Sequence, residues 1–134
     1  MSRVEIRVTI SSDQDIVAAR QKGRSLALEL GFSSGDATLI ATAISELARN
    51  IVSYAGSGQI ALKEVQGSTR VGIIVTASDN GPGIPNVSQA LRDGFSTSGS
   101  LGLGLPGVRR LMDEFEIASQ PAQGTKVVVK KWRP

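Results

Sequence analysis

The chain has 134 residues, a net charge of +3 and 40% hydrophobic residues, which predicts one globular domain over residues 1–134. It contains no Cys and no His, so disulfides and thiolate metal sites are excluded, and any catalytic base must be a carboxylate or a Lys. No apolar segment approaches the roughly 20 residues that span a bilayer, and the first ten residues lack the apolar block of a signal peptide. We therefore expect a cytoplasmic protein that does not contact a membrane.

The first elements are a strand and a helix. Residues 3–10 alternate apolar and polar side chains, which predicts a half-buried strand. Ser12 and Asp15 form a candidate capping box at the start of a helix, and Gly31 is a typical residue to end it. This helix is expected to have a structural role.

A second capping box, Ser33 and Asp36, predicts the start of another helix. Its apolar residues recur at helical spacing and should face the core: Ala37, Ile40, Ala41, Ile44, Leu47, Ala48 and Ile51. Glu46 and Asn50 are one turn apart on a flank away from this stripe. Periodicity alone favours a solvated helix face for both residues.

The remaining regular segments complete an α+β pattern. The order predicts a two-layer sandwich in which helices cover one face of a mixed, mostly antiparallel sheet. Residues 66–69 are expected to form the turn of a hairpin. The expected strands are residues 59–65, 71–77, 115–118 and 125–131, and the expected helix is residues 105–115.

Basic residues gather only near the end of the chain, at Lys126, Lys130, Lys131 and Arg133. Their alternation with Val residues favours the solvated face of a last strand. A nucleic-acid patch would require more charge and exposed aromatic residues. No nucleic-acid partner is therefore expected.

A glycine-rich stretch over residues 79–107 follows the buried strand of residues 71–77 and indicates a nucleotide-binding loop. Asp79 should emerge at the strand end, where a carboxylate can face a ligand, although Asp before Asn-Gly is also typical of a simple turn. Gly81 and Gly83 allow the backbone to turn sharply and to approach a ligand closely.

Two common nucleotide motifs do not fit this stretch. Residues 102–107 match G-x-G-x-x-G literally, but a dinucleotide fingerprint follows a strand directly and has an acidic residue about 20 positions later. Here a Ser/Thr/Gly-rich loop precedes the glycines, and the nearest acidic residues come too early. The P-loop pattern is absent because no Lys follows a glycine at the required place.

Four short motifs instead resemble the boxes of the GHKL ATPases, the superfamily of histidine kinases, gyrase-type ATPases and Hsp90. Asp79-Asn-Gly81-Pro-Gly83 resembles the D-x-G-x-G box, and Glu46-Leu-Ala-Arg-Asn50 resembles the N box. Residues 102–105 resemble the second glycine box, and Gly124-Thr125 resembles the last box. Any one motif alone is weak, but the four occur in the family's order and cover residues 40–130.

The resemblance implies a Bergerat-type fold that binds ATP and Mg²⁺. It implies that Glu46 is the general base, that Asn50 helps to hold Mg²⁺, and that Asp79 accepts a hydrogen bond from the adenine amino group. The segment from about residue 84 to 101 would form a lid over the phosphates. The implied nucleotide-binding residues are Asn50, Asp79, Gly81, Gly83, Ile84, Gly99, Ser100, Leu101, Gly102, Leu103, Gly104 and Thr125.

Within the superfamily, the chain most resembles the small bacterial serine kinases of partner-switching pathways, the stressosome switch kinases among them. The resemblance lies in residues 46–60, in DNGPGI and in residues 100–117. Such kinases phosphorylate a serine or threonine of STAS-domain proteins, and the switch kinases also activate a PP2C-type phosphatase. The family's second glycine box has the longer pattern G-x-G-L-G-L, which aligns with residues 100–105. One departure is that Ser100 stands in place of the first glycine of this pattern.

Two alternatives remain. The first is an anti-sigma factor of the same fold that sequesters a sigma factor and has a secondary serine kinase activity. The second is a scaffold that has lost its kinase activity, but the presence of Glu46, Asn50 and Asp79 argues against a decayed site.

Overall fold

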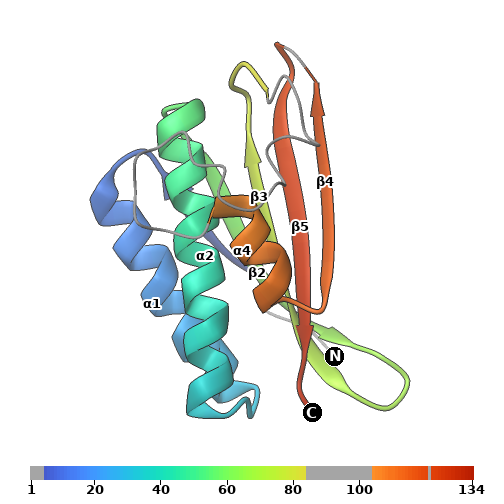
Figure 1. The fold of residues 1–134 in the computed structure, drawn as a ribbon. Helices are drawn as coiled ribbons and strands as arrows, with labels where there is room; N and C mark the ends of the chain where they lie inside the picture. Colours follow the sequence, from blue (N-terminus) through green and yellow to red (C-terminus); the bar gives the residue numbers. More distant parts are fainter. Residues whose placement is uncertain (1–4, 84–103, 121) are drawn as a thin grey trace.

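The computed structural model describes residues 5–83, 104–120 and 122–134, and these form two layers. One layer is a five-stranded sheet. The other contains helices α1, α2 and α4, which cover the same face of the sheet (Figure 1). The two-layer α+β architecture predicted from the sequence is thus confirmed. Within the described ranges, no helix is long and apolar enough to cross a membrane.

The strand order in the sheet is β1-β2-β3-β5-β4, so the last strand of the chain lies between β3 and β4. Every pairing among the described strands is antiparallel, so the sheet is mostly antiparallel as expected, but the described strands include none of the parallel pairs that a mixed sheet would contain. The predicted hairpin joins β2 to β3. The strands are Glu5–Ile10 (β1), Gly58–Gln66 (β2), Val71–Asp79 (β3), Glu114–Gln120 (β4) and Gly124–Trp132 (β5).

Helix α1, Asp13–Glu29, ends as Gly31 predicts. Gly31 has a φ of 92° and donates its N–H to the carbonyl of Leu28 at 3.1 Å. The next N–H, that of Phe32, bonds the carbonyl of Ala27 at 3.0 Å. These two bonds form a Schellman motif, so the helix ends in the left-handed residue that glycine adopts without strain.

The capping box predicted at the start of α1 forms only in part. The Ser12 side chain makes no capping hydrogen bond. Asp15 instead accepts from the backbone N–H of Ser11 at 2.9 Å, from the Ser11 hydroxyl at 3.1 Å and from the Ser12 hydroxyl at 3.3 Å. These bonds, the backbone one above all, lower the pKa of the Asp15 carboxyl. The carboxylate therefore binds the residue before the N-cap, which holds β1 to the start of α1.

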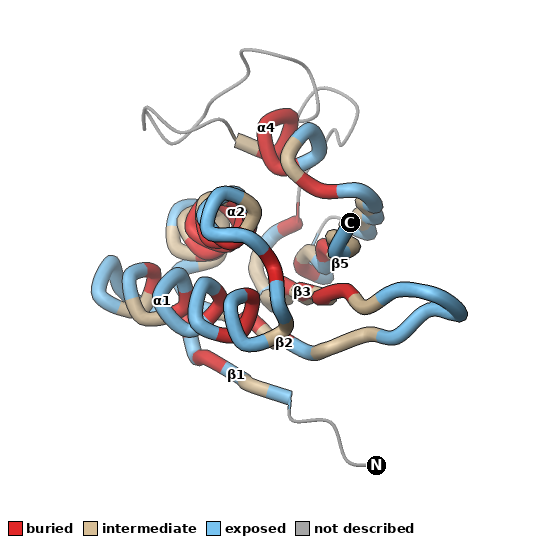
Figure 2. The backbone as a smooth tube through the Cα atoms, turned by 90° about the horizontal axis from the view of Figure 1, so that it is seen from below, coloured by how far each residue is buried: buried red, intermediate tan, exposed pale blue. Residues whose placement is uncertain are grey.

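Helix α2, Ser34–Tyr54, begins as predicted, because the Ser33 hydroxyl accepts from the N–H of Asp36 at 3.1 Å. The helix packs against α1, against α4 and against strands β2 and β3 of the sheet. In Figure 2 it lies between the other two helices, above the middle of the sheet. This helix is therefore the centre of the hydrophobic core.

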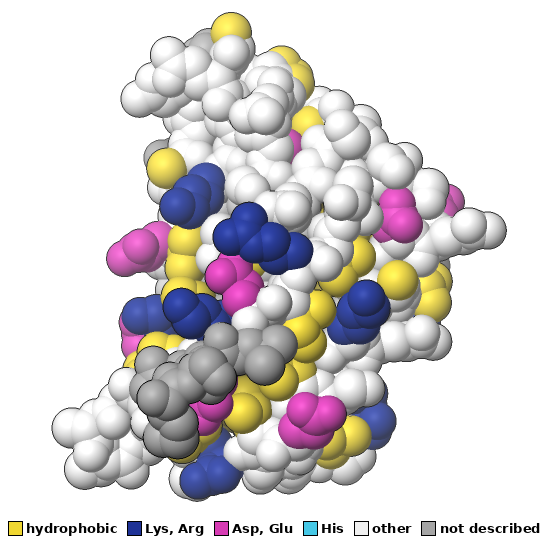
Figure 3. Space-filling model, turned by 180° about the vertical axis from the view of Figure 1, so that it is seen from behind, with side chains coloured by type: hydrophobic (Ala, Val, Ile, Leu, Met, Phe, Trp, Pro, Cys, Tyr) yellow, Lys and Arg dark blue, Asp and Glu magenta, His cyan; other side chains and the backbone are white. Residues whose placement is uncertain are grey.

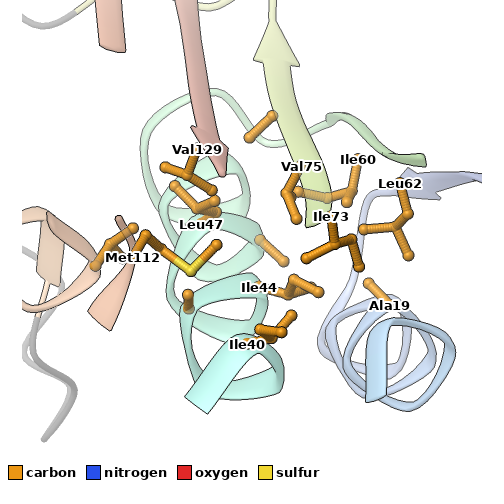
Figure 4. Close-up of a cluster of buried hydrophobic side chains, with 14 of the residues drawn as sticks. Ala19, Ile40, Ile44, Leu47, Ile60, Leu62, Ile73, Val75, Met112 and Val129 are labelled. Carbon is orange, nitrogen blue, oxygen red and sulfur yellow. The ribbon is translucent and has the colours of Figure 1, made fainter. Parts of the chain in front are cut away.

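The core fills the space between the helices and the inner face of the sheet. Figure 4 shows Ile40, Ile44 and Leu47 of α2 pointing toward the strands, with Met112 on one side and Ala19 of α1 on the other. The largest fully buried side chains are Ile10, Ile40, Ile44, Leu47, Ile60, Leu62, Ile73, Val75, Val108 and Val129. The apolar stripe expected on α2 is confirmed by its burial.

Helix α4, Gly104–Leu111, is shorter than the helix predicted over residues 105–115. The N–H of Asp113 already donates to the carbonyl of Lys130 on β5, at 2.9 Å, and β4 begins one residue later. From Asp113 on, the residues that helical periodicity predicted to form one more turn of α4 therefore bond to β5 instead.

The basic residues near the end of β5 have partners within the protein. Lys131 Nζ donates to the carbonyl of Leu111 at 3.0 Å, and Arg133 donates to the carbonyl of Leu30 at 2.8 Å. Lys130 lies 3.8 Å from the Glu114 carboxylate. Figure 3, the view from behind, shows basic and acidic side chains mixed around a band of hydrophobic ones. These contacts give Lys130, Lys131 and Arg133 a structural role.

The turn between β4 and β5 packs against the segment that follows β3. The N–H of Ala122 donates to the carbonyl of Pro82 at 2.7 Å. Gly83 has a φ of 80°, and a Cβ at that position would overlap the carbonyl of Gln120. The end of β3 is thus held in place by a neighbouring turn, and glycine is needed because two backbone segments touch.

We predict that Gly124→Ala destabilises the protein by more than about 2 kcal/mol, because it combines backbone strain with overpacking. Gly124 has a φ of 85°, and an added Cβ would overlap the carbonyl oxygen of Asp79. Gly56→Ala is the matched control, since Gly56 has a φ of 81° but no atom within 4 Å of its added Cβ. The control should cost only the backbone strain, about 1 kcal/mol. Urea unfolding measures both, and equal losses would show that the contact with Asp79 is unimportant.

Candidate functional site

A pocket opens between helix α2 and the β3–β5 pair, close to the start of α4. Three residues predicted from the sequence line it together: Asn50, Asp79 and Thr125. The rest of its lining is largely apolar, consisting of Leu47, Ile51, Tyr54, Ala77, Leu105 and Val127. Apolar walls with a few polar groups are typical of small-molecule sites.

The helical wall of the pocket follows from the period of α2. Leu47, Asn50, Ile51 and Tyr54 are spaced i, i+3, i+4 and i+7, so they lie on one face of the helix. Leu47 and Ile51 are buried, while Asn50 and Tyr54 are half-buried. The polar ends of the two half-buried residues therefore stand at the rim of an apolar surface.

The wall formed by the sheet follows from strand register. Asp79 of β3 pairs with Thr125 of β5, and Ala77 pairs with Val127. These residues are two apart on each strand, so all four point to the helical side of the sheet. Segments nearly 50 positions apart in sequence thus form one surface.

Asp79 both forms a turn and lines the pocket. Its Oδ1 accepts the N–H of Gly81 at 2.9 Å, the hydrogen bond of the turn that Asp before Asn-Gly predicts. A carboxylate has two oxygens with several acceptor sites, so the turn leaves acceptor capacity for a ligand. The two interpretations of Asp79 are therefore compatible.

Tyr54 is a pocket residue that the sequence analysis did not identify. Burial raises the pKa of its phenol above the usual value, so the hydroxyl stays protonated and can donate a hydrogen bond. Its spacing of four residues from Asn50 is the signal that could have revealed it, because both lie on the same helix face.

Glu46 does not lie on a solvated face, contrary to what periodicity favours. The residue is 6% exposed. Its Oε1 accepts the N–H of Gly104 at 3.0 Å, and its Oε2 accepts from Arg49 Nη1 at 2.7 Å. Helix α4 packs on this flank of α2 and buries Glu46. The α2 sequence alone does not indicate this packing.

The glycines of the predicted boxes approach the protein's own chain. A Cβ on Gly81 would lie 2.8 Å from the Cα of Ala55, at the end of α2. Gly83 packs on the β4–β5 turn, and Gly104, with a φ of 65°, starts α4. We expected glycine at positions 81 and 83 because the backbone there approaches a ligand closely. In the structure, glycine is required at both positions because another backbone segment packs against each of them.

Six predicted nucleotide-binding residues lie outside the described residues. They are Ile84, Gly99, Ser100, Leu101, Gly102 and Leu103. The lid expected over residues 84–101 lies outside them as well.

The described residues offer few ligands for a metal ion. No group of three or more acidic side chains gathers in the described part of the chain. The Asn50 side chain, in the pocket, supplies one oxygen of the kind that Mg²⁺ prefers. A divalent cation here would need further oxygen ligands, which phosphates and water can supply.

Comparison with known proteins gives one family and several relatives. Residues 35–134 match the family described as histidine kinase-, DNA gyrase B- and HSP90-like ATPases. The chain is 54% identical to the serine/threonine-protein kinase RsbT of Bacillus subtilis over 93% of its own length and 94% of that protein. It is 25% identical to an anti-sigma F factor of Clostridium kluyveri, over 91% of the chain and 89% of that protein.

Solved structures share the fold at lower identity. The mycobacterial sensor histidine kinase MprB matches with a TM-score of 0.54 and 17% identity, over 98% of this chain and 99% of that one. The catalytic domain of the histidine kinase ThkA matches with a TM-score of 0.52 and 18% identity, over 98% and 95%. Similarity at this level concerns the fold alone.

Proposed function

The chain belongs to the family of histidine kinase-, DNA gyrase B- and HSP90-like ATPases, and we propose that it acts as an RsbT-like serine/threonine protein kinase in a partner-switching pathway. Its proposed substrates are STAS-domain proteins of a cytoplasmic stress-response assembly, the stressosome. After release from them it would activate a PP2C-type phosphatase. The 54% identity to the kinase RsbT, over nearly the whole of both chains, carries this proposal.

Adenine of ATP would lie in the pocket between α2 and the β3–β5 pair. The apolar side chains of Leu47, Ile51 and Val127 suit a flat aromatic base. The Asp79 carboxylate, with one oxygen on Gly81, would accept the adenine amino group with its remaining acceptor capacity. Guanine has a keto oxygen at the equivalent position and cannot donate there, so this contact would select adenine.

The phosphates would extend toward the start of α4. Backbone N–H groups and the helix dipole favour an anion at such a position. Asn50 would contribute its amide oxygen to Mg²⁺, which neutralises charge on the phosphates when bound. Thr125 would contribute a hydroxyl at the pocket wall. Roles for Gly99 to Leu103 remain predictions from the family resemblance.

Glu46 would act as the general base. Phosphoryl transfer needs the phosphates held in line and a group that accepts the proton of the attacking hydroxyl. The chain has no His or Cys, and Glu46 is a buried carboxylate bonded to the first N–H of α4. It would take the proton from a serine or threonine hydroxyl of the substrate as that oxygen bonds to the γ-phosphorus of ATP, while the bond from the γ-phosphorus to the bridging oxygen breaks and ADP leaves.

An anti-sigma factor is the second candidate function. Relatives with that name are 25–28% identical to this chain over about nine-tenths of its length. The same fold could therefore bind a sigma factor directly. The twofold higher identity to the kinase favours the first candidate.

The main test is to incubate the protein with labelled ATP, Mg²⁺ and the STAS-domain proteins of the same organism. Transfer of label to a serine or threonine of a STAS protein is the expected result. Activation of a PP2C-type phosphatase by the free chain should be measured in parallel. Capture of a sigma factor without transfer to any STAS protein would instead support the second candidate.

We predict that Asp79→Asn lowers ATP affinity about tenfold and removes most of the preference for ATP over GTP, as expected for loss of a hydrogen bond to a charged group. The Asn carbonyl can keep the turn bond to Gly81, while its amide presents a donor to the base. Asp79→Ala is the comparison variant, because it loses the turn bond as well. Titration with both nucleotides measures the change, and an unaltered ATP preference in the Asn variant would leave Asp79 as a turn residue only.

We predict that Glu46→Gln lowers the rate of phosphoryl transfer about 10²-fold, the lower end for a general base, since a loose transition state depends less on proton removal. The Gln carbonyl can still accept the Gly104 N–H in the nucleotide-free protein, so folding should remain close to that of the parent. ATP affinity should also change little, because Glu46 is not among the residues that line the pocket. Single-turnover transfer to a STAS protein and nucleotide titration measure the two effects. A rate within about twofold of the parent, worth only ~0.4 kcal/mol, would falsify the assignment of the base.

A further inference from the structure

The Glu46 carboxylate has two partners that come from different parts of the chain. Oε2 accepts from Arg49, which is one turn further along the same helix, at 2.7 Å. Oε1 accepts from the N–H of Gly104, at the start of α4, at 3.0 Å. One bond therefore depends only on α2, and the other depends on the position of α4.

The bond to Gly104 would not survive nucleotide binding if the phosphates lie at the start of α4. Phosphate oxygens and the Glu46 carboxylate are both anions, and both seek N–H groups at a helix start. Glu46 Oε1 would have to leave Gly104 when a phosphate takes that N–H. A carboxylate 8% exposed at its side chain and beside phosphates then needs another positive or donor group.

Arg49 meets that need. Its guanidinium is always charged and carries donors in a rigid plane, so it can hold one carboxylate oxygen in a fixed orientation. Its bond to Glu46 lies within one helix and does not require α4 to stay in place. With Oε2 held there, Oε1 would be free to accept the proton of the substrate hydroxyl.

We infer that Arg49 is a positioning residue, which holds the Glu46 carboxylate in a productive orientation when the nucleotide is bound. The inference rests on the proposed kinase function and adds a residue to it. Neither Arg49 nor Glu46 is among the residues that line the pocket, and the 2.7 Å contact between them is the route by which Arg49 would act.

The test compares Arg49→Met, Arg49→Lys and a surface control, Arg20→Met. Met retains the aliphatic length of Arg without the charge, and Lys restores the charge without the planar fork. Arg20 is an exposed arginine of α1 for which no ion pair is found within the described residues. Hydrolysis of Mg·ATP by the full chain needs no partner protein, and transfer to a STAS protein adds the second readout.

For Arg49→Met we expect kcat to fall about tenfold, while KM for ATP stays within about twofold, as loss of a transition-state interaction alone predicts. Arg49→Lys should recover a large part of the rate, and Arg20→Met should match the parent. In a Glu46→Gln background, Arg49→Met should lower the rate by less than about twofold, because residues that act as one unit are not additive.

Several outcomes would overturn the inference. Equal losses from Arg49→Met in both backgrounds would show that Arg49 acts independently of Glu46. A raised KM with unchanged kcat would make Arg49 a phosphate contact. If Arg49→Met has a normal kcat while Glu46→Gln has a low one, Arg49 is not a positioning residue, but Glu46 remains the general base. Normal kcat in both variants would overturn the base assignment as well, so the two failures are distinguishable.

Discussion

The burial of helix α2 fixes most of the structure and the position of the candidate site. The helix packs on α1, on the sheet and on α4, so it has little freedom to rotate or slide. Ile40, Ile44 and Leu47 fill the core, and the face that continues from Leu47 carries Asn50 and Tyr54. A change that repositions α2 in the core would therefore also displace the polar groups of the pocket, because one rigid helix carries both.

Close packing of backbone segments supports the other wall. The turn between β4 and β5 lies directly on the chain that follows Asp79, at Pro82 and Gly83. Gly83 and Gly124 permit this contact, since a side chain at either position would overlap a carbonyl group. The register of β3 and β5 then sets Asp79 beside Thr125. Sites held by rigid strands keep their geometry better than sites on free loops.

The fold alone does not decide what the protein does. Relatives named as a kinase and as anti-sigma factors align along about nine-tenths of this chain, and histidine kinases share the architecture at 17–18% identity. One fold commonly supports several functions, so the function depends on particular side chains. Here the most informative one is Glu46, because a buried carboxylate is costly unless its partners are arranged for it.

The sequence by itself determined the α+β class, the strands, the start of α2, the end of α1 and the residues worth testing, because periodicity, caps and glycine placement are local properties. It also indicated Asn50, Asp79 and Thr125 through short motifs. Only the tertiary structure decided that these three line one pocket, that Tyr54 joins them, and that Glu46 is buried against Gly104 and Arg49. Those facts depend on strand register and on the cover that α4 provides. Contacts between residues 58 positions apart leave no trace in local spacing.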